Sequence, residues 1–162
     1  MTCVYLQTDD LPTAGLSVRD PCPVLAALRL IRSVRLPTIL IVDDHALIRT
    51  AVREMLESCF ESIACREAEN GAEAIIKAQE LKPDLIVLDV SMPVMNGFEA
   101  AKILHQILPE VPVFLLTAHY VEATTQAAVQ VGIRAVFSKS ADLTPLLTQA
   151  RAVLQPLTPQ NA

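Results

Sequence analysis

From residue 38 onward, short apolar runs alternate with amphipathic segments, and this order constrains the fold more than any other feature of the chain. Each run has the aliphatic content of a buried strand, and each amphipathic segment repeats its apolar residues at helical spacing. Strands joined by crossover helices lie parallel in one sheet that is covered on both faces. We therefore predict a doubly wound α/β domain with five strands, near 38–42, 63–65, 85–88, 111–116 and 135–137, and helices near 47–56, 71–81, 97–108, 121–131 and 142–154.

Composition agrees with this fold, since apolar residues make up 52% of the chain and aromatic residues only 4%. Buried parallel strands flanked by helices have such an aliphatic core. The net charge of −5 argues against an electrostatic grip on nucleic acid, which needs clustered lysine and arginine. The four cysteines include no CxxC pair, and no apolar run approaches the roughly 18 residues that span a bilayer. We expect reduced thiols, no membrane insertion and a cytoplasmic location.

The chain is expected to consist of one domain with a segment on either side. Residues 1–36 do not follow the alternation; they contain several prolines, four arginines and a short stretch of helical pattern over 24–34. We expect this N-terminal extension to be flexible. The domain should cover residues 37–155, and residues 156–162 form a C-terminal tail that is too short for a second domain.

Polar residues close most of the apolar runs. Asp43 and Asp44 follow the first expected strand, Asp89 the third, Thr117 the fourth and Lys139 the fifth. Because ligands bind at the carboxyl edge of an open α/β sheet, these side chains should meet at one site. Carboxylates at about 5 Å repel by about 3 kcal/mol at an effective dielectric of about 20, and a cation relieves this repulsion. Carboxylate oxygens favour Mg²⁺, and the scattered histidines argue against zinc.

The chemistry expected at this edge is phosphoryl transfer. Asp89 would be the nucleophile and would form an aspartyl-phosphate. Lys139 contributes an ammonium and Thr117 a hydroxyl donor, which with a metal ion would stabilise the charge on the transferring group. Of the nearby histidines, His45 is expected to open the first helix rather than to bind metal, and His119 to border the site.

Five segments of the chain resemble the receiver domains of two-component response regulators, over roughly residues 37–155. The Asp-x-x-Met-Pro-x-Met-Asn-Gly stretch is specific by itself, and the other segments fall at fitting intervals. The resemblance implies the flavodoxin-like fold of these domains, with strand order 2-1-3-4-5. The matching segments are Ile41–His45, Glu67–Gly71, Asp89–Gly97, Leu115–Ala118 and Phe137–Lys139.

The resemblance also implies a role for each polar residue. The phosphoacceptor would be Asp89, and its phosphoryl oxygens would contact Thr117 and Lys139. Mg²⁺ would be the cofactor. Its ligands would be three carboxylates and one backbone carbonyl, supplied by Asp43, Asp44, Asp89 and Ser91 respectively.

Protein partners follow from the same resemblance, with no nucleic acid or membrane among them. The phosphodonor would be a phosphohistidine on a sensor histidine kinase or a histidine phosphotransfer protein. The output would be an unknown downstream protein that docks when phosphorylation biases a two-state surface. The chain would catalyse only its own phosphorylation and dephosphorylation, so we do not expect an enzyme. Receivers often form homodimers through the fourth helix, fifth strand and fifth helix.

One departure from the family pattern leaves an alternative function open. Receivers usually carry an aromatic residue three positions before the lysine, where this chain has Val136. Either the relay from the site is weakened, or a one-residue bulge moves Phe137 into that place. The alternative is a binding module of the same fold that works without phosphorylation. A phosphatase with an Asp nucleophile is disfavoured because its pattern needs a second Asp where Ser91 stands. A DNA-binding regulator shortened to its receiver is a further alternative, although the sequence shows no recognition helix to read bases.

Overall fold

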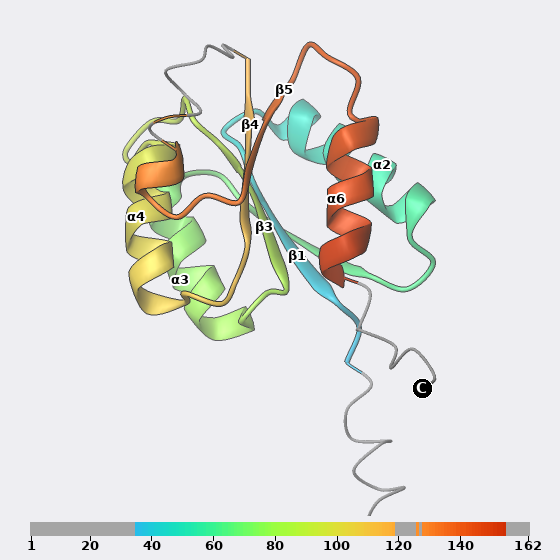
Figure 1. Ribbon diagram of the computed structural model, residues 1–162, viewed down its shortest axis with the longest axis horizontal. Coiled ribbons are helices and arrows are strands. Elements are labelled where there is room, and N and C mark those ends of the chain that lie inside the picture. Colours follow the sequence, from blue (N-terminus) through green and yellow to red (C-terminus); the bar gives the residue numbers. More distant parts are fainter. Residues whose placement is uncertain (1–34, 119–125, 127, 155–162) are drawn as a thin grey trace, which may run out of the picture. The chain divides into compact units, whose positions relative to one another are not determined.

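A single parallel sheet organises the domain (Figure 1). The computed structural model describes residues 35–118, 126 and 128–154. The strand order is β2-β1-β3-β4-β5, which confirms the predicted fold class and order. The strands are β1 (Thr38–Val42), β2 (Ala64–Ala68), β3 (Leu85–Asp89), β4 (Val113–Thr117) and β5 (Ala135–Ser138). The helices are α2 (Ala46–Cys59), α3 (Gly71–Leu81), α4 (Gly97–Ile107) and α6 (Thr144–Leu154).

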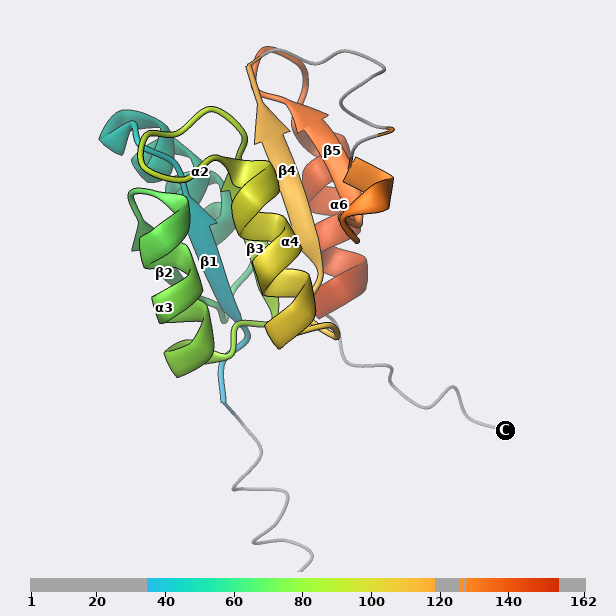
Figure 2. The same cartoon turned by 90° about the vertical axis from the view of Figure 1, so that its left-hand side faces the viewer.

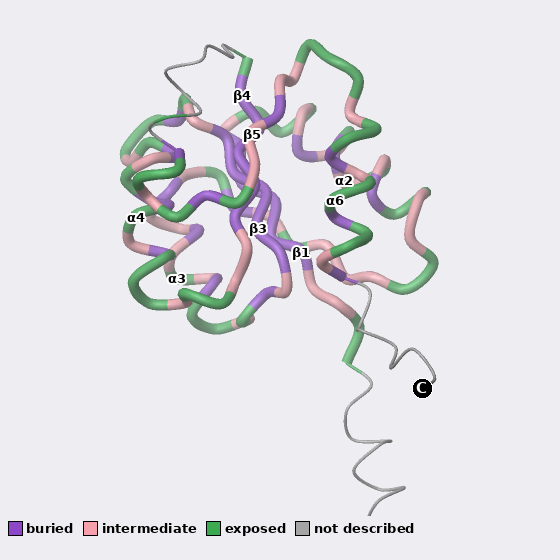
Figure 3. The backbone as a smooth tube through the Cα atoms, in the orientation of Figure 1, coloured by how far each residue is buried: buried purple, intermediate pink, exposed green. Residues whose placement is uncertain are grey.

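Helices cover both faces of the sheet, as Figures 1 and 2 show: α3 and α4 lie on one face, α2 and α6 on the other. Because side chains alternate along a strand, each face has its own apolar core. Ile86 and Leu88 pack toward α3 and α4, whereas Leu85 and Val87 pack on the opposite face. The central strands β3 and β4 are buried along their whole length, which Figure 3 shows in purple. This two-sided burial explains their continuous apolar sequence.

Asparagine side chains cap the first turns of two helices, α3 and α4. Asn70 accepts a hydrogen bond from the Glu73 backbone N–H at 2.9 Å and so caps α3. The α4 helix begins with a capping box, in which Asn96 and Glu99 each bond the backbone of the other. The helix expected over 121–131 is described only in part: residues 126 and 128–130 are helical, and Gly132 follows at φ +78°, the conformation of a helix-ending glycine.

Two strand boundaries differ from those predicted. The second strand was predicted near 63–65, but β2 runs from Ala64 to Ala68, in register with the whole of β1. Its two charged residues hid the strand pattern: Arg66 is exposed, whereas Glu67 lies on the other face and pairs with Arg49 and Arg53 of α2. The fourth strand begins at Val113 rather than Val111. The Pro112 ring has no N–H to donate, although its carbonyl accepts from the Ile86 N–H at 3.0 Å.

The chain divides into two units by its contacts, Met1–Arg35 and Leu36–Ala162, and the sheet belongs to the second. The predicted properties of segments 1–36 and 156–162 fall almost wholly outside the described residues, and so does the short helical pattern over 24–34. Among the helices that are described, none combines the length and the hydropathy needed to cross a bilayer.

Candidate functional site

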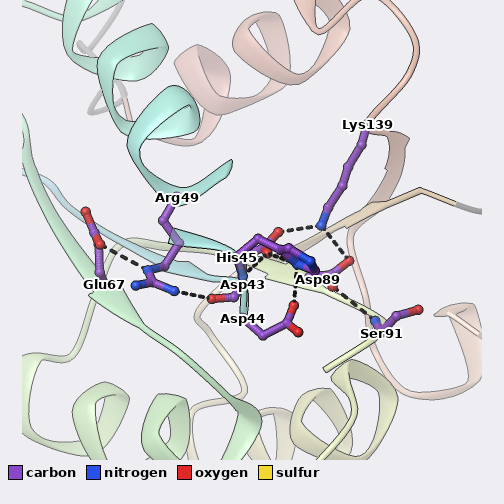
Figure 4. A network of polar contacts seen from close by, with 8 residues as sticks. All are labelled: Asp43, Asp44, His45, Arg49, Glu67, Asp89, Ser91 and Lys139. Carbon is purple, nitrogen blue, oxygen red and sulfur yellow. Dashed lines mark hydrogen bonds and ion pairs between the residues drawn. The ribbon is translucent and has the colours of Figure 1, made fainter. Parts of the chain in front are cut away.

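Two buried carboxylates and one ammonium meet at the carboxyl edge of the sheet (Figure 4). Asp43 follows β1, Asp89 ends β3 and Lys139 follows β5, so three strands deliver them to one place. The Lys139 Nζ forms an ion pair with Asp43 Oδ2 and lies 3.1 Å from Asp89 Oδ1. Asp43 and Asp89 are each only 3% exposed. The ammonium therefore bridges two carboxylates that would otherwise repel each other.

Asp44 is less buried and turns toward His45. The His45 Nδ1 lies 2.8 Å from Asp44 Oδ1, and the His45 backbone N–H donates to Asp43 Oδ1 at 2.9 Å. His45 is the N-cap of α2, as predicted, but its side chain does not cap the helix. Ligand atoms of Asp43, Asp44 and His45 lie within 4.8 Å of one another, close enough to hold one metal ion. The imidazole thus lies beside the acidic pair, which the sequence interpretation did not anticipate.

Burial and charge act against each other at this site. Burial raises the pKa of the Asp89 carboxyl above its ordinary value, although the hydrogen bond and charge of Lys139 lower it in part. For Lys139, burial alone would lower the pKa, but hydrogen bonds to Asp43 and Asp89 outweigh it and raise the pKa. Ionised Asp89 therefore lacks full compensation from the protein. A divalent cation fits this need, because the available donors are hard carboxylate oxygens.

The remaining predicted site residues lie around this cluster. Thr117 is buried at the end of β4, and its carbonyl accepts from the Lys139 backbone N–H at 2.8 Å. Ser91 is exposed and donates its backbone N–H to Asp89 Oδ2 at 3.2 Å. Ala118 is exposed next to Thr117, whereas His119 lies outside the described residues.

A glycine brings the first turn of α4 against the end of β3, the strand that carries Asp89. The Gly97 N–H donates to the Val90 carbonyl at 2.9 Å. A Cβ at this position would lie 2.1 Å from the Asp89 carbonyl oxygen, far inside van der Waals contact. Only glycine permits the close approach, which explains its place in the matching segment Asp89–Gly97.

A three-residue turn in the loop after β3 holds Val94 in a strained conformation. The Met95 N–H donates to the Pro93 carbonyl at 2.7 Å, and Val94 between them has φ +69°. Positive φ is unusual for a β-branched residue. The Val94 side chain is 86% exposed, so packing does not compensate for the strain.

We expect Val94→Gly to raise the free energy of unfolding by about 1 kcal/mol, because glycine relieves the positive-φ strain at a modest entropic cost. Urea denaturation checks this. Val94→Ala is the control, since it keeps a Cβ at positive φ and should recover only part of the gain. A Val94→Gly protein less stable than wild type would contradict the argument.

The strand that carries Val136 settles which face each residue occupies. Over the described residues of both strands, β4 and β5 pair one to one from Phe114↔Ala135 to Thr117↔Ser138. The alternative of a one-residue bulge is therefore wrong. Phe137 packs edge-on against Phe114, with ring centroids 5.5 Å apart, on the side of α2 and α6. Val136 packs on the side of α3 and α4, where Thr117 also lies by strand alternation.

The fold and the acidic edge together define a class of signalling domain. Residues 39–151 match the response regulator receiver domain, which is more than half of the chain, and the chain belongs to this family. It is thus a receiver domain of a two-component system, as the resemblance of its motifs implied.

Individual relatives show the same kinship. The chain is 33% identical over 115 residues to the response regulator GacA of Pseudomonas viridiflava. The aligned residues make up 71% of this chain and 54% of that protein. It is also 42% identical over 79 residues to a protein-glutamate methylesterase/protein-glutamine glutaminase of Methanococcoides burtonii. These aligned residues make up 49% of this chain and 22% of that protein. The chain therefore spans about half or less of these curated relatives.

Solved structures agree on the fold. The chemotaxis protein CheY4 of Vibrio cholerae superposes with a TM-score of 0.67 at 31% identity, over 74% of this chain and all 100% of that one. The response regulator TrrA of Thermotoga maritima, solved in complex with Mg²⁺ and BeF, has a TM-score of 0.66 at 28% identity, with the same two coverages, 74% and 100%.

Proposed function

We propose that this domain accepts a phosphoryl group on Asp89 in a Mg²⁺-dependent step. The observation that carries the proposal is the Lys139 ammonium, which lies between the buried carboxylates of Asp43 and Asp89. A buried carboxylate beside a fixed ammonium offers a nucleophile together with a positive charge for the phosphoryl oxygens. The match to receiver domains supports the same assignment.

The phosphoryl group would pass from a phosphohistidine to Asp89 in one displacement. A carboxylate oxygen of Asp89 attacks the phosphorus of a phosphohistidine, and the P–N bond breaks. The donor imidazole leaves with that electron pair and takes a proton, while Asp89 becomes an acyl phosphate. Lys139 and the hydroxyl of Thr117 would stabilise the charge on the phosphoryl oxygens.

Mg²⁺, when bound, would neutralise charge on the phosphoryl group. The residues that would hold it are the three carboxylates and one backbone carbonyl of Asp43, Asp44, Asp89 and Ser91. The acidic cluster fits a cation on its own chemistry, and the TrrA complex contains Mg²⁺ and BeF.

Two kinds of protein partner belong to this proposed function, a phosphodonor and a downstream recipient. The donor is a sensor histidine kinase or a histidine phosphotransfer protein in the cytoplasm, and the recipient of the signal is a downstream protein that recognises the phosphorylated state. The domain catalyses no reaction beyond its own phosphorylation and dephosphorylation. A homodimer would form through residues 121–131, β5 and α6.

Asp89→Asn is expected to abolish phosphorylation by acetyl phosphate, because an amide cannot form the acyl phosphate. Intact-protein mass spectrometry with Mg²⁺ present measures the gain of one phosphoryl group. The matched control is Asp84→Asn, which changes an aspartate just before β3, at the opposite edge of the sheet. A wild-type protein that gains no phosphoryl group, or an Asp89→Asn protein that does, would overturn the proposal.

Val136 favours a second candidate, a receiver-fold module whose binding surface does not respond to phosphorylation. Amide NMR shifts with Mg²⁺ and beryllofluoride distinguish the two. Shifts confined to the surroundings of Asp89 would support the module, whereas shifts that extend to β5 and α6 would show that phosphorylation changes the docking surface.

A further inference from the structure

A buried arginine connects the acidic edge to a helix that carries none of the proposed site residues. Arg49 on α2 is only 7% exposed, and its guanidinium reaches three acceptors, of which Figure 4 shows those on Asp43 and Glu67. It donates through Nη1 to the Asp43 backbone carbonyl at 2.7 Å. It also donates through Nε to Glu67 Oε2 at 3.1 Å and through Nη2 to Glu69 Oε1 at 3.2 Å. One side chain therefore joins α2, the end of β1 and the end of β2.

A second arginine also ties α2 to the sheet, without touching the Asp43 carbonyl. Glu67 is held by a second arginine one turn further along the helix, because Arg53 Nη1 lies 2.7 Å from Glu67 Oε1. The Arg53 side chain is half-exposed. The Arg49 side chain is buried, and besides contacting Glu67 its guanidinium donates to the uncharged backbone carbonyl of Asp43. Bringing a guanidinium out of water costs several kcal/mol unless its donors are satisfied, so the carbonyl is part of what holds Arg49 in place.

Each polar group of Asp43 is fixed by a different part of the fold. Its N–H donates to the Ala68 carbonyl at 3.2 Å, and its carboxylate contacts the His45 N–H and Lys139. The remaining polar group of Asp43, its backbone carbonyl, accepts the hydrogen bond from Arg49. Because the peptide unit is planar, fixing this carbonyl also fixes the amide of Asp44 and the position of the Cα from which the Asp44 side chain leaves the chain.

We propose that Arg49 is a positioning residue for the cation site: it orients the peptide between Asp43 and Asp44 so that both carboxylates face the same ion. The inference rests on the proposed function, since it assigns the acidic pair to Mg²⁺. Residues that orient metal ligands without touching the metal typically change its affinity by about 10–100-fold when removed. Arg49 occupies that place relative to Asp43.

Arg49→Met and Arg53→Met form the matched test. Both remove one arginine from Glu67, and only the first removes the donor to the Asp43 carbonyl. Isothermal titration calorimetry should show Mg²⁺ dissociation constants about 10-fold or more higher for Arg49→Met and within about twofold of wild type for Arg53→Met. In the metal-free protein, amide hydrogen exchange at Asp44 and His45 should accelerate in Arg49→Met alone.

Equal weakening of Mg²⁺ binding in both variants would overturn the proposal, because the effect would then come from anchoring α2. Unchanged affinity in a folded Arg49→Met protein would overturn it as well. If Arg49→Met does not fold, Arg49→Lys decides: an ammonium cannot reach all three acceptors, and affinity equal to wild type would contradict the assignment. A wild-type protein that is phosphorylated while Arg49 variants bind Mg²⁺ normally would refute this inference and leave the proposed function standing.

Discussion

Gly97→Ala is expected to destabilise the domain by about 3 kcal/mol and to weaken phosphorylation of the neighbouring aspartate. In an unconstrained helix the same change is stabilising by about 1 kcal/mol, so the sign tests the packing argument. The added Cβ would lie 2.1 Å from the Asp89 carbonyl oxygen, where neither backbone can move without shifting the other. Urea denaturation measures the stability, and mass spectrometry after acetyl phosphate treatment measures phosphorylation.

Gly71→Ala provides the graded comparison for this prediction. A Cβ at Gly71 would meet Ala100 Cβ, Met95 Cγ and the Met95 carbonyl oxygen, each at 2.9 Å. These contacts are longer, and one involves a flexible methionine, so the loss of stability should be smaller than for Gly97→Ala. A Gly97→Ala protein as stable as wild type would show that α4 can withdraw from β3 without cost.

Lys139→Ala is expected to slow phosphorylation by acetyl phosphate about 100-fold, the usual effect of removing one donor to a developing charge. It should also leave the two buried carboxylates without their bridging ammonium. The pKa of Asp89, already above its ordinary value of 3.8, should then rise further. The pKa of this carboxyl is 3.8 in the unfolded chain and higher in the folded protein, so the folded protein loses stability as the pH rises above 3.8. The variant, in which this pKa is raised further, should therefore be less stable than wild type at neutral pH.

Mg²⁺ should restore part of the stability that Lys139→Ala loses, because a cation replaces the missing charge. Thermal denaturation with and without Mg²⁺ at pH 7 measures the stability that is restored. The phosphorylation rate is measured by mass spectrometry on samples quenched at successive times after acetyl phosphate is added. Lys102→Ala, an exposed lysine on α4, is the control and should match wild type in both. Wild-type phosphorylation rates in Lys139→Ala would contradict the role proposed for the ammonium.

Strand alternation and strand-end chemistry made most of this architecture predictable from the sequence. Buried strands such as β3 and β4 are continuous apolar runs, and their order along the chain fixes a parallel sheet. The convergence of Asp43, Asp89 and Lys139 followed from the rule that ligands bind at the carboxyl edge, and the structure does bring these three together.

Features that depend on how one element lies on another could not be predicted in the same way. The contact of Arg49 with the Asp43 carbonyl depends on the rotation of α2 over β1 and β2, which no local pattern specifies. The spacing of Arg49 and Arg53, four residues apart on the expected helix, was the available signal for a shared acidic partner. The positive φ of Val94 was hidden because valine favours extended backbone.

The contact between Lys139 and Asp43 joins residues 96 positions apart in the chain, from the first strand to just after the last. A polypeptide that ends before the final strand therefore cannot form this ion pair, however well its earlier part has folded. Under the proposed function, only a domain whose last strand has folded could accept a phosphoryl group, so the phosphorylated form would also report that folding is complete.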